Sequence, residues 1–318
     1  MKKNQTNQKN KPAVSGRSNV KLSTRIWKHR DYYLMLLPAL VYIILFNYVP
    51  MYGLQIAFKD YRVSLGITGS KWVGFKHFIT FFNSFNFWDL LTNTLTLSLY
   101  RLLVGFPIPI FVALVINELK GRYKQTIQTI LYAPHFLSIV VIAGMIRVMF
   151  SMSNGVVNHI IEALGGEPIY FMASEEWFRH LYVWSGIWQE MGWAAIIYIA
   201  ALAGVDPGLH EAASIDGATR LQRVIHINIP TILPTIIITL ILNVGQLISI
   251  GHEKVFLLQT ELNINASEVI STYVYKKGII NTNYSFSAAV GMFNNVTNVI
   301  LLIVANQISK RVTKTSLF

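Results

Sequence analysis

Six long apolar stretches recur along the chain, separated by more polar segments. Each can cross the roughly 30 Å hydrocarbon core of a bilayer, which needs about 20 residues in a helix. The runs are continuous, whereas the strands of a membrane barrel alternate polar and apolar residues over about ten positions. The pattern therefore predicts an all-α integral membrane protein with six transmembrane helices. The predicted spans are residues 33–51, 93–116, 127–150, 181–204, 229–250 and 287–307.

Composition supports a membrane protein. Of the 318 residues, 53% are hydrophobic and only 13% are charged, whereas soluble domains carry about 25% charged residues. The chain has no cysteine, which excludes disulfides, thiolate metal sites and cysteine nucleophiles.

The net charge of +12 would ordinarily suggest a nucleic-acid partner, but its placement indicates membrane orientation. If the amino terminus is cytoplasmic, 17 of the 27 Lys and Arg residues lie in cytoplasmic segments. The positive-inside rule then predicts that both termini are cytoplasmic, where the excess charge faces anionic lipid. We therefore expect no nucleic-acid partner.

These spans and this orientation predict an organisation for the whole chain. The first 30 residues are polar and basic, and the apolar run behind them continues through bulky residues, so we expect a retained anchor rather than a cleaved signal peptide. The predicted parts are a cytoplasmic basic tail at 1–32, a first transmembrane helix at 33–51, an extracytoplasmic loop at 52–92, a five-helix core at 93–307 with a cytoplasmic loop at 205–228, and a cytoplasmic tail at 308–318.

The cytoplasmic loop at 205–228 contains signals for two short helices. Asp206 and Pro207 form a helix start, because the Asp side chain can cap free N–H groups and Pro has no donor to lose. Gly217 is suited to end that helix in a left-handed conformation. From the residues alone, the segment fits equally well a pair of helices joined by a glycine turn and a single amphipathic helix lying on lipid, which Arg220 and Arg223 would suit.

A sequence motif decides between these interpretations. The segment EAASIDGATRLQRVIHINIP resembles the EAA-x3-G-x9-I-x-L-P signature of the membrane subunits of binding-protein-dependent ABC importers, with Ile229 where Leu is usual. The resemblance covers most of the chain and is strongest to the sugar branch, particularly permeases for oligosaccharides and polysaccharide fragments. It implies a type I permease fold in which this loop docks into a groove on an ATPase. The implied coupling residues are Glu211, Ala212, Ala213, Asp216, Gly217 and Pro230.

The same resemblance implies partners for the chain. These are a second homologous permease, cytoplasmic ATPase subunits and an extracytoplasmic solute-binding protein, in a bacterial cell membrane. The sequence has no G-x-x-x-x-G-K-[ST] phosphate loop, so we expect no cofactor in this chain, with ATP and Mg²⁺ bound by the partner ATPases. We do not expect an enzyme, because His210-Glu211-Ala212-Ala213-Ser214 lacks the second His of a zinc protease and no G-x-S-x-G motif occurs.

Polar and aromatic residues within the spans are candidates for a sugar path. Amides bond hydroxyl groups in both directions, and indole faces cover the apolar faces of sugar rings. The alternative is that such residues pack helices together, which we favour for Ser287 and Gly291. Trp184 would equally suit an interfacial belt. The candidate path residues are Asn243, Gln246, Asn294, Asn298, Trp188, Glu190 and Trp184.

Three charged residues fall inside the predicted spans. Glu190 is a candidate for a functional site, although a buried partner such as Arg101 would make it structural. We expect Arg101 to form an ion pair rather than contact solute. Arg147 lies near a span end, where snorkelling to the interface explains it.

Three alternatives to a carbohydrate importer follow from the sequence. An ABC permease for a different solute would carry the same EAA loop. A self-sufficient channel or secondary carrier would need an ion-coupling cluster, and it would leave the EAA loop unexplained. A membrane-embedded transferase would need a nucleophile or metal cluster, which the sequence does not offer.

Overall fold

The computed structural model describes residues 27–318, which are predominantly helical. The chain divides into two compact units, residues 1–54 and 55–318. The predicted tail at 1–32 lies almost entirely outside the described residues. In the first unit, α2 (Arg30–Ile43), the π-helical turn η1 (Ile44–Tyr48) and α3 (Val49–Met51) follow one another without a break. The predicted first span, 33–51, lies within this helix, whose side chains are exposed as expected of a helix that lipid surrounds.

The second unit contains three further long apolar helices. The first combines α6 (Phe87–Gly105) and α7 (Pro107–Glu118). The helix is interrupted at Phe106, because Pro107 and Pro109, which follow it, lack the N–H donors of a continuous helix. The second joins α13 (Arg220–Arg223), η4 (Val224–Asn228) and α14 (Ile229–Val244) into 25 residues. The third is α18 (Tyr284–Thr313).

Two bent pairs of helices complete the set of candidate spans. The first joins α8 (Gly121–Tyr132) and the 3₁₀ turn η3 (Ala133–Phe136) to α9 (Ile139–Met149) at 96°. In the second, α11 (Glu175–Leu202) is the long apolar helix, and α12 (Pro207–Ile215) follows it at 76°. Four long helices and two bent pairs among the described residues give up to six spans, which agrees with the predicted number.

The third predicted span, 127–150, is not one continuous helix. Pro134 opens the 3₁₀ turn, Leu137 is extended, and Ser138 caps α9 by accepting a hydrogen bond from the Val141 N–H at 3.3 Å. A Pro removes one donor of a helix, and an N-cap residue starts a new helix with a new direction. The apolar pattern continues across this break, so it could not reveal the 96° bend.

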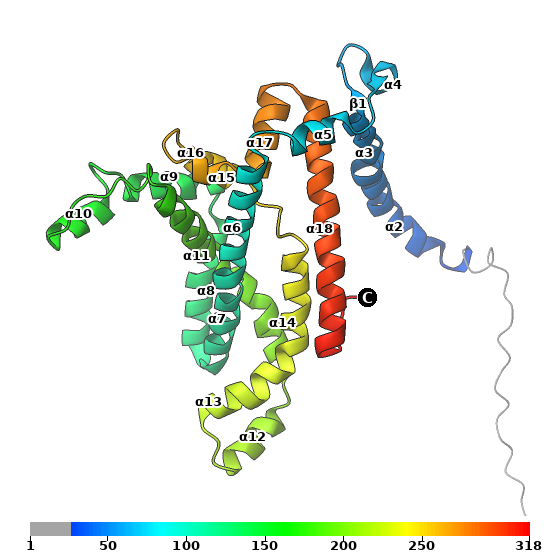
Figure 1. Cartoon of the computed structure of the whole chain (residues 1–318). Coiled ribbons are helices and arrows are strands. Elements are labelled where there is room, and N and C mark those ends of the chain that lie inside the picture. Colours follow the sequence, from blue (N-terminus) through cyan, green and yellow to red (C-terminus); the bar gives the residue numbers. More distant parts are fainter. Residues whose placement is uncertain (1–26) are drawn as a thin grey trace, which may run out of the picture. The chain divides into compact units, whose positions relative to one another are not determined.

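Shorter elements connect these helices. The connection between α3 and α6 holds the 3₁₀ helix η2 (Tyr52–Phe58), the strands β1 (Lys59–Asp60) and β2 (Lys71–Trp72), and the helix α5 (Lys76–Phe82). The two strands form an antiparallel pair in which Lys59 opposes Trp72. Figure 1 shows α12 and α13 at one end of this unit, and α5, α15, α16 and α17 at the other. The bounds of the short elements are β1 Lys59–Asp60, α4 Gly66–Gly69, β2 Lys71–Trp72, α5 Lys76–Phe82, α10 Val156–Ala163, α15 His252–Leu258, α16 Ile264–Ser267, α17 Ile270–Tyr275 and η5 Lys276–Ile280.

Helix α11 forms the centre of the second unit. It packs against α6, α7, α8 and α14, and its buried residues Phe178 and Val183 join Leu97, Ile142 and Val255 in the largest apolar cluster. Such a core fixes the positions of polar side chains that neighbouring helices direct between them.

Candidate functional site

The loop between α11 and α14 forms two helical arms joined by a turn, residues 206–223, which we call the α12 elbow. The Asp206 carboxylate caps the first arm by accepting from the Gly208 N–H at 2.9 Å, and Pro207 stands at the helix start. Gly217 ends this arm with a φ of +77°, and the Ala218 N–H donates to the Ala213 carbonyl at 2.8 Å. These bonds satisfy groups that a helix end otherwise leaves free.

The second arm is fixed in the same way. Thr219 and Gln222 form a capping box, and the Arg223 guanidinium donates to the Ser214 hydroxyl of the first arm at 2.7 Å. The arm continues through η4 into α14, where Pro230 stands in the first turn. Both ends of the elbow are therefore joined directly to membrane-spanning helices.

Five of the six predicted coupling residues gather on the elbow surface. Glu211, Ala212 and Asp216 are exposed, and Ile215 beside them is 86% exposed. A shallow hollow lies next to the turn, and it is lined by Ala213, Asp216, Gly217, Ala218, Gln222, Arg223, His226 and Ile227. Exposed apolar side chains around a hollow are typical of a surface that another protein covers.

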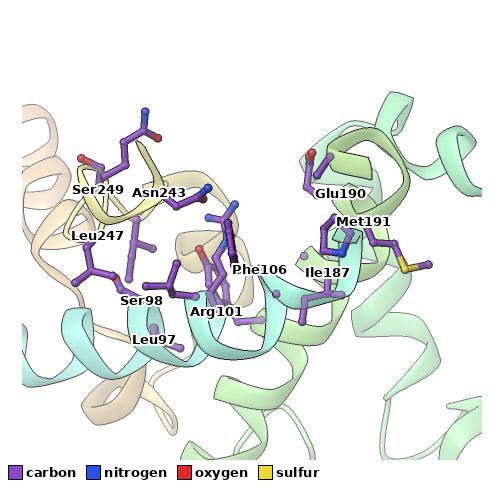
Figure 2. Close-up of a pocket in the computed structure, with 18 of the residues that line it drawn as sticks. Leu97, Ser98, Arg101, Phe106, Ile187, Glu190, Met191, Asn243, Leu247 and Ser249 are labelled. Atoms are coloured by element: carbon purple, nitrogen blue, oxygen red, sulfur yellow. The ribbon is translucent and has the colours of Figure 1, made fainter. Parts of the chain in front are cut away.

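A central cavity of about 180 Å³ lies between α6, α7, α11 and the end of α14. Figure 2 shows side chains from these elements around it, with Arg101 and Glu190 apart from each other. The cavity brings together three of the seven predicted path residues, Glu190, Asn243 and Gln246.

The helix of the predicted fifth span, 229–250, is shorter than expected. Helix α14 ends at Val244, so Gln246 lies in the following turn. Asn243 is within the helix, where its amide donates to the Thr239 carbonyl at 2.8 Å. Asn243 and Gln246 still reach one cavity, because the turn folds back beside the helix end.

The other two predicted amides lie elsewhere. The Asn298 carbonyl oxygen accepts from the Ile248 N–H at 3.2 Å, and its amide donates to the Ser249 hydroxyl at 2.7 Å. The Asn294 amide is 3.5 Å from the Ile248 carbonyl. Neither side chain lines the central cavity, and both hold the turn that carries Gln246.

The two predicted tryptophans do not line the cavity either. The Trp184 indole donates to the Tyr100 hydroxyl at 3.0 Å, and Trp188 is 40% exposed. Both therefore lie at the surface of α11 rather than around the central cavity.

The expected Arg101–Glu190 ion pair is wrong. The Glu190 carboxylate is instead 3.1 Å from the His135 Nδ1, and His135 stacks on Trp193. The Arg101 guanidinium lies close to the Tyr182 hydroxyl, and Arg101 belongs to none of the ion pairs of the described residues. Tyr182 lies eight residues before Glu190, about 12 Å along α11, so an arginine bound there is directed away from the carboxylate.

Lys254 on α15 is a site residue that sequence reasoning missed. Its side chain is only 8% exposed, and its Nζ lies 5.3 Å from the centre of the Tyr182 ring. Among the described residues its ammonium has no hydrogen-bond acceptor. Burial, and secondarily the charge of Arg101, lower the pKa of Lys254 to about 8, while Glu190 opposes this shift. In the sequence, the apolar run that follows Lys254, from Val255 to Leu258, indicates that helix α15 is buried.

Lys254 lines a side hollow of about 330 Å³ that adjoins the central cavity. Arg101, Tyr182, Gly186 and Glu190 belong to the walls of both spaces. The volume of the side hollow is within the range of small-molecule sites, about 300–1,000 Å³.

Arg147, near the end of α9, also contacts a neighbouring helix. Its guanidinium donates to the Leu257 carbonyl at 2.5 Å and so joins α9 to α15.

Within residues 27–318, no group of three His, Asp or Glu side chains is placed to bind a metal ion.

The sequence and the fold are similar to those of known membrane transport proteins. Residues 105–314 match the family described as binding-protein-dependent transport system inner membrane component. The polygalacturonan/rhamnogalacturonan transport system permease protein YteP of Bacillus subtilis is 44% identical, covering 92% of this chain and 91% of that protein. Protein LplB of Bacillus subtilis is 42% identical, covering 96% of this chain and 97% of that protein.

A solved structure matches the fold over nearly the whole chain. It is a chain of a bacterial alginate ABC transporter in complex with an alginate pentasaccharide-bound periplasmic protein. The TM-score is 0.85 at 41% identity, with 94% of this chain and all of that chain covered. A second structure, of a transporter involved in the import of the acidic polysaccharide alginate, has a TM-score of 0.84.

Proposed function

Because the chain belongs to the family of binding-protein-dependent transport system inner membrane components, we propose that it is the permease subunit of an ATP-driven importer for an oligosaccharide or polysaccharide fragment. The relative YteP is named for polygalacturonan/rhamnogalacturonan transport, and both solved structures are of transporters for alginate. That similarity, at more than 40% identity over nearly the full length, supports a carbohydrate over other solutes.

The α12 elbow is the observation that carries the transport mechanism. A short helix with both ends satisfied by hydrogen bonds behaves as a rigid body. Because α11 leads into one arm and α14 leads out of the other, a displacement of the elbow turns two cavity-lining helices. Solute passage by alternating access needs such a movement of one helix group against another.

The driving energy comes from partner subunits. We assign the elbow face with Glu211, Asp216 and Ile215 to a cytoplasmic ATPase, which binds ATP and Mg²⁺. Both termini then lie in the cytoplasm of a bacterium, and the opposite end of the unit, with α5 and α15, receives a solute-binding protein. A second homologous permease completes the path, with the chain acting as a non-enzymatic subunit.

The cavity supplies suitable contacts for a sugar. Asn243 and Gln246 offer both donors and acceptors to hydroxyl groups. We assign Asn294, Asn298, Trp184 and Trp188 to the structure around this path rather than to its wall.

Cysteine cross-linking tests the ATPase dock. The chain has no natural cysteine, so a single Ile215→Cys variant is specific without further changes. Ile215 is 86% exposed on the elbow, and Leu164, which is 84% exposed after α10, provides a matched control. We expect a short bifunctional thiol–amine reagent to link Ile215→Cys to the ATPase and Leu164→Cys not to. Equal yields at both positions would contradict the docking assignment.

Uptake in cells tests the cargo. A strain that lacks this chain should lose accumulation of radiolabelled oligosaccharides and regain it when the chain is supplied. Accumulation of carbohydrate that is unchanged by the deletion would contradict a role in carbohydrate import, whatever the result of the cross-linking.

A further inference from the structure

The strongest unexplained feature of the chain is a buried cation without a counter-ion. Lys254 is only 8% exposed, and among the described residues its Nζ has no hydrogen-bond acceptor. A buried charge is expensive unless an opposite charge and hydrogen bonds compensate it. A lysine buried in this way beside a cavity is therefore suited to bind an anion that the chain itself does not supply.

A second cation points to the same place. Arg101 on α6 and Lys254 on α15 meet at Tyr182 of α11, where the guanidinium lies close to the hydroxyl and the ammonium lies 5.3 Å from the ring centre. A guanidinium has five N–H donors, so its contact with one tyrosine leaves donors available. Tyr182 thus positions both cations without neutralising either.

The carboxylates nearby are held or directed elsewhere. Glu190 is engaged by His135 at 3.1 Å, and Glu253 has an exposed side chain although it borders the side hollow. The ammonium also lies close to α11, because a Cβ added at Gly186 would come 3.3 Å from the Lys254 Nζ. The absence of a side chain at Gly186 therefore leaves space beside the ammonium.

We infer that Arg101 and Lys254, positioned by Tyr182, form a subsite for the carboxylate of a uronate residue, so that the solute is an acidic oligosaccharide. Carboxylates suit this pair, because arginine binds them through two parallel hydrogen bonds and lysine adds a point charge. The inference rests on the proposed function that a carbohydrate passes this cavity. It agrees with the alginate transporter, whose cargo is described as an acidic polysaccharide.

This subsite would also give selectivity. A neutral sugar entering it would leave the buried Lys254 ammonium uncompensated, whereas a uronate supplies the missing charge. Sites built to bond a particular group discriminate strongly against analogues without it, because their buried polar groups then stay unpaired.

Transport by the complete transporter in proteoliposomes tests this inference. The probes are radiolabelled trimers of galacturonate and of guluronate, their methyl esters, which keep the sugar ring and lose the charge, and neutral trimers. The variants are Lys254→Met, Lys254→Arg and, on a different helix, Arg101→Gln. Lys277→Met is the matched control, because the Lys277 Nζ lies 5.6 Å from the centre of the Tyr273 ring and outside both spaces.

We expect the wild-type complex to import a uronate trimer in preference to its methyl ester. Lys254→Met and Arg101→Gln should each reduce uronate uptake by about tenfold or more, as expected for loss of a charge-assisted bond. Lys254→Arg should recover most of the uptake, and Lys277→Met should change it less than about twofold. The amount of assembled complex, measured by size-exclusion chromatography, normalises every rate.

Several results would overturn the inference. One is import of neutral trimers and methyl esters without import of uronates, which leaves the proposed carbohydrate function intact. Another is normal uronate uptake by both Lys254→Met and Arg101→Gln. A third is loss of assembly in Lys254→Met, with Arg101→Gln importing uronates normally, which would assign Lys254 to the interface with a partner subunit. Import of no carbohydrate by the wild-type complex would instead refute the proposed function itself.

Discussion

Gly217 is the position at which the backbone of the α12 elbow is most sensitive to substitution. Its φ is +77°, and a Cβ added there would meet nothing within 4 Å. Any penalty for a side chain therefore comes from backbone conformation and not from collision. A left-handed conformation costs an ordinary L residue about 1–2 kcal/mol, and more for a β-branched one.

A Gly217→Val substitution should consequently weaken the closed turn by about 2 kcal/mol, or about 30-fold in its population. Opening the turn releases the Ala218–Ala213 hydrogen bond of 2.8 Å and separates the two arms. The first arm then no longer transmits movement to α14. We expect the variant to reach the membrane normally but to lose most of the solute-stimulated ATPase activity of the assembled transporter.

A substitution series separates conformation from side-chain size. Asn tolerates the left-handed region, Ala less so and Val least, so stimulation should fall in the order Gly217→Asn, Gly217→Ala, Gly217→Val. Gly144→Val is the control, because Gly144 in α9 also has nothing within 4 Å and does not have a positive φ. Full stimulation in Gly217→Val, or equal losses in the Asn and Val variants, would refute the reasoning.

Three further substitutions test the packing that positions the site. Gly192→Ala should destabilise the chain by about 1–3 kcal/mol, because a Cβ there overlaps the Leu131 carbonyl; thermal unfolding in detergent checks this, and a midpoint equal to that of Gly144→Ala would contradict it. Asn263→Leu should destabilise the chain by about 2–4 kcal/mol, because the lost amide donates to the Met172 carbonyl and accepts from the Thr260 N–H, both at 2.9 Å. The exposed Asn265→Leu should destabilise the chain less in the same thermal unfolding experiment. Arg147→Met should speed hydrogen exchange in α15 by freeing the Leu257 carbonyl, and unchanged exchange would rule out that anchor.

The membrane spans and the ends of α12 could be predicted because both depend on local pattern. The apolar runs indicated six spans, and Asp206, Pro207 and Gly217 carry the start and end signals of α12 within a few residues. The choice of two short helices over one amphipathic helix came from the resemblance to the EAA signature. The bend after Pro134 could not be placed, because the residues on both sides are equally apolar.

The cavity was harder to predict, because it depends on contacts between distant segments. Arg101 and Glu190 have opposite charges and similar depths in their spans, so a pair was expected, but Arg101 lies close to Tyr182 and Glu190 pairs with His135. Lys254 lies 64 residues beyond Glu190 in a segment between spans, and only the packing of α15 on α9 and α11 buries it. The predicted span 229–250 also placed Gln246 in a helix that ends two residues earlier.

The central claim is that this chain couples carbohydrate passage to ATP hydrolysis on partner subunits. The most direct test is accumulation of a radiolabelled oligosaccharide in proteoliposomes that contain the chain with its second permease, ATPase and solute-binding protein. We predict accumulation only when the complete set and hydrolysable ATP are present, and loss of accumulation with Gly217→Val. Equal accumulation by the chain alone, without ATPase or ATP, would identify a self-sufficient carrier and contradict the account.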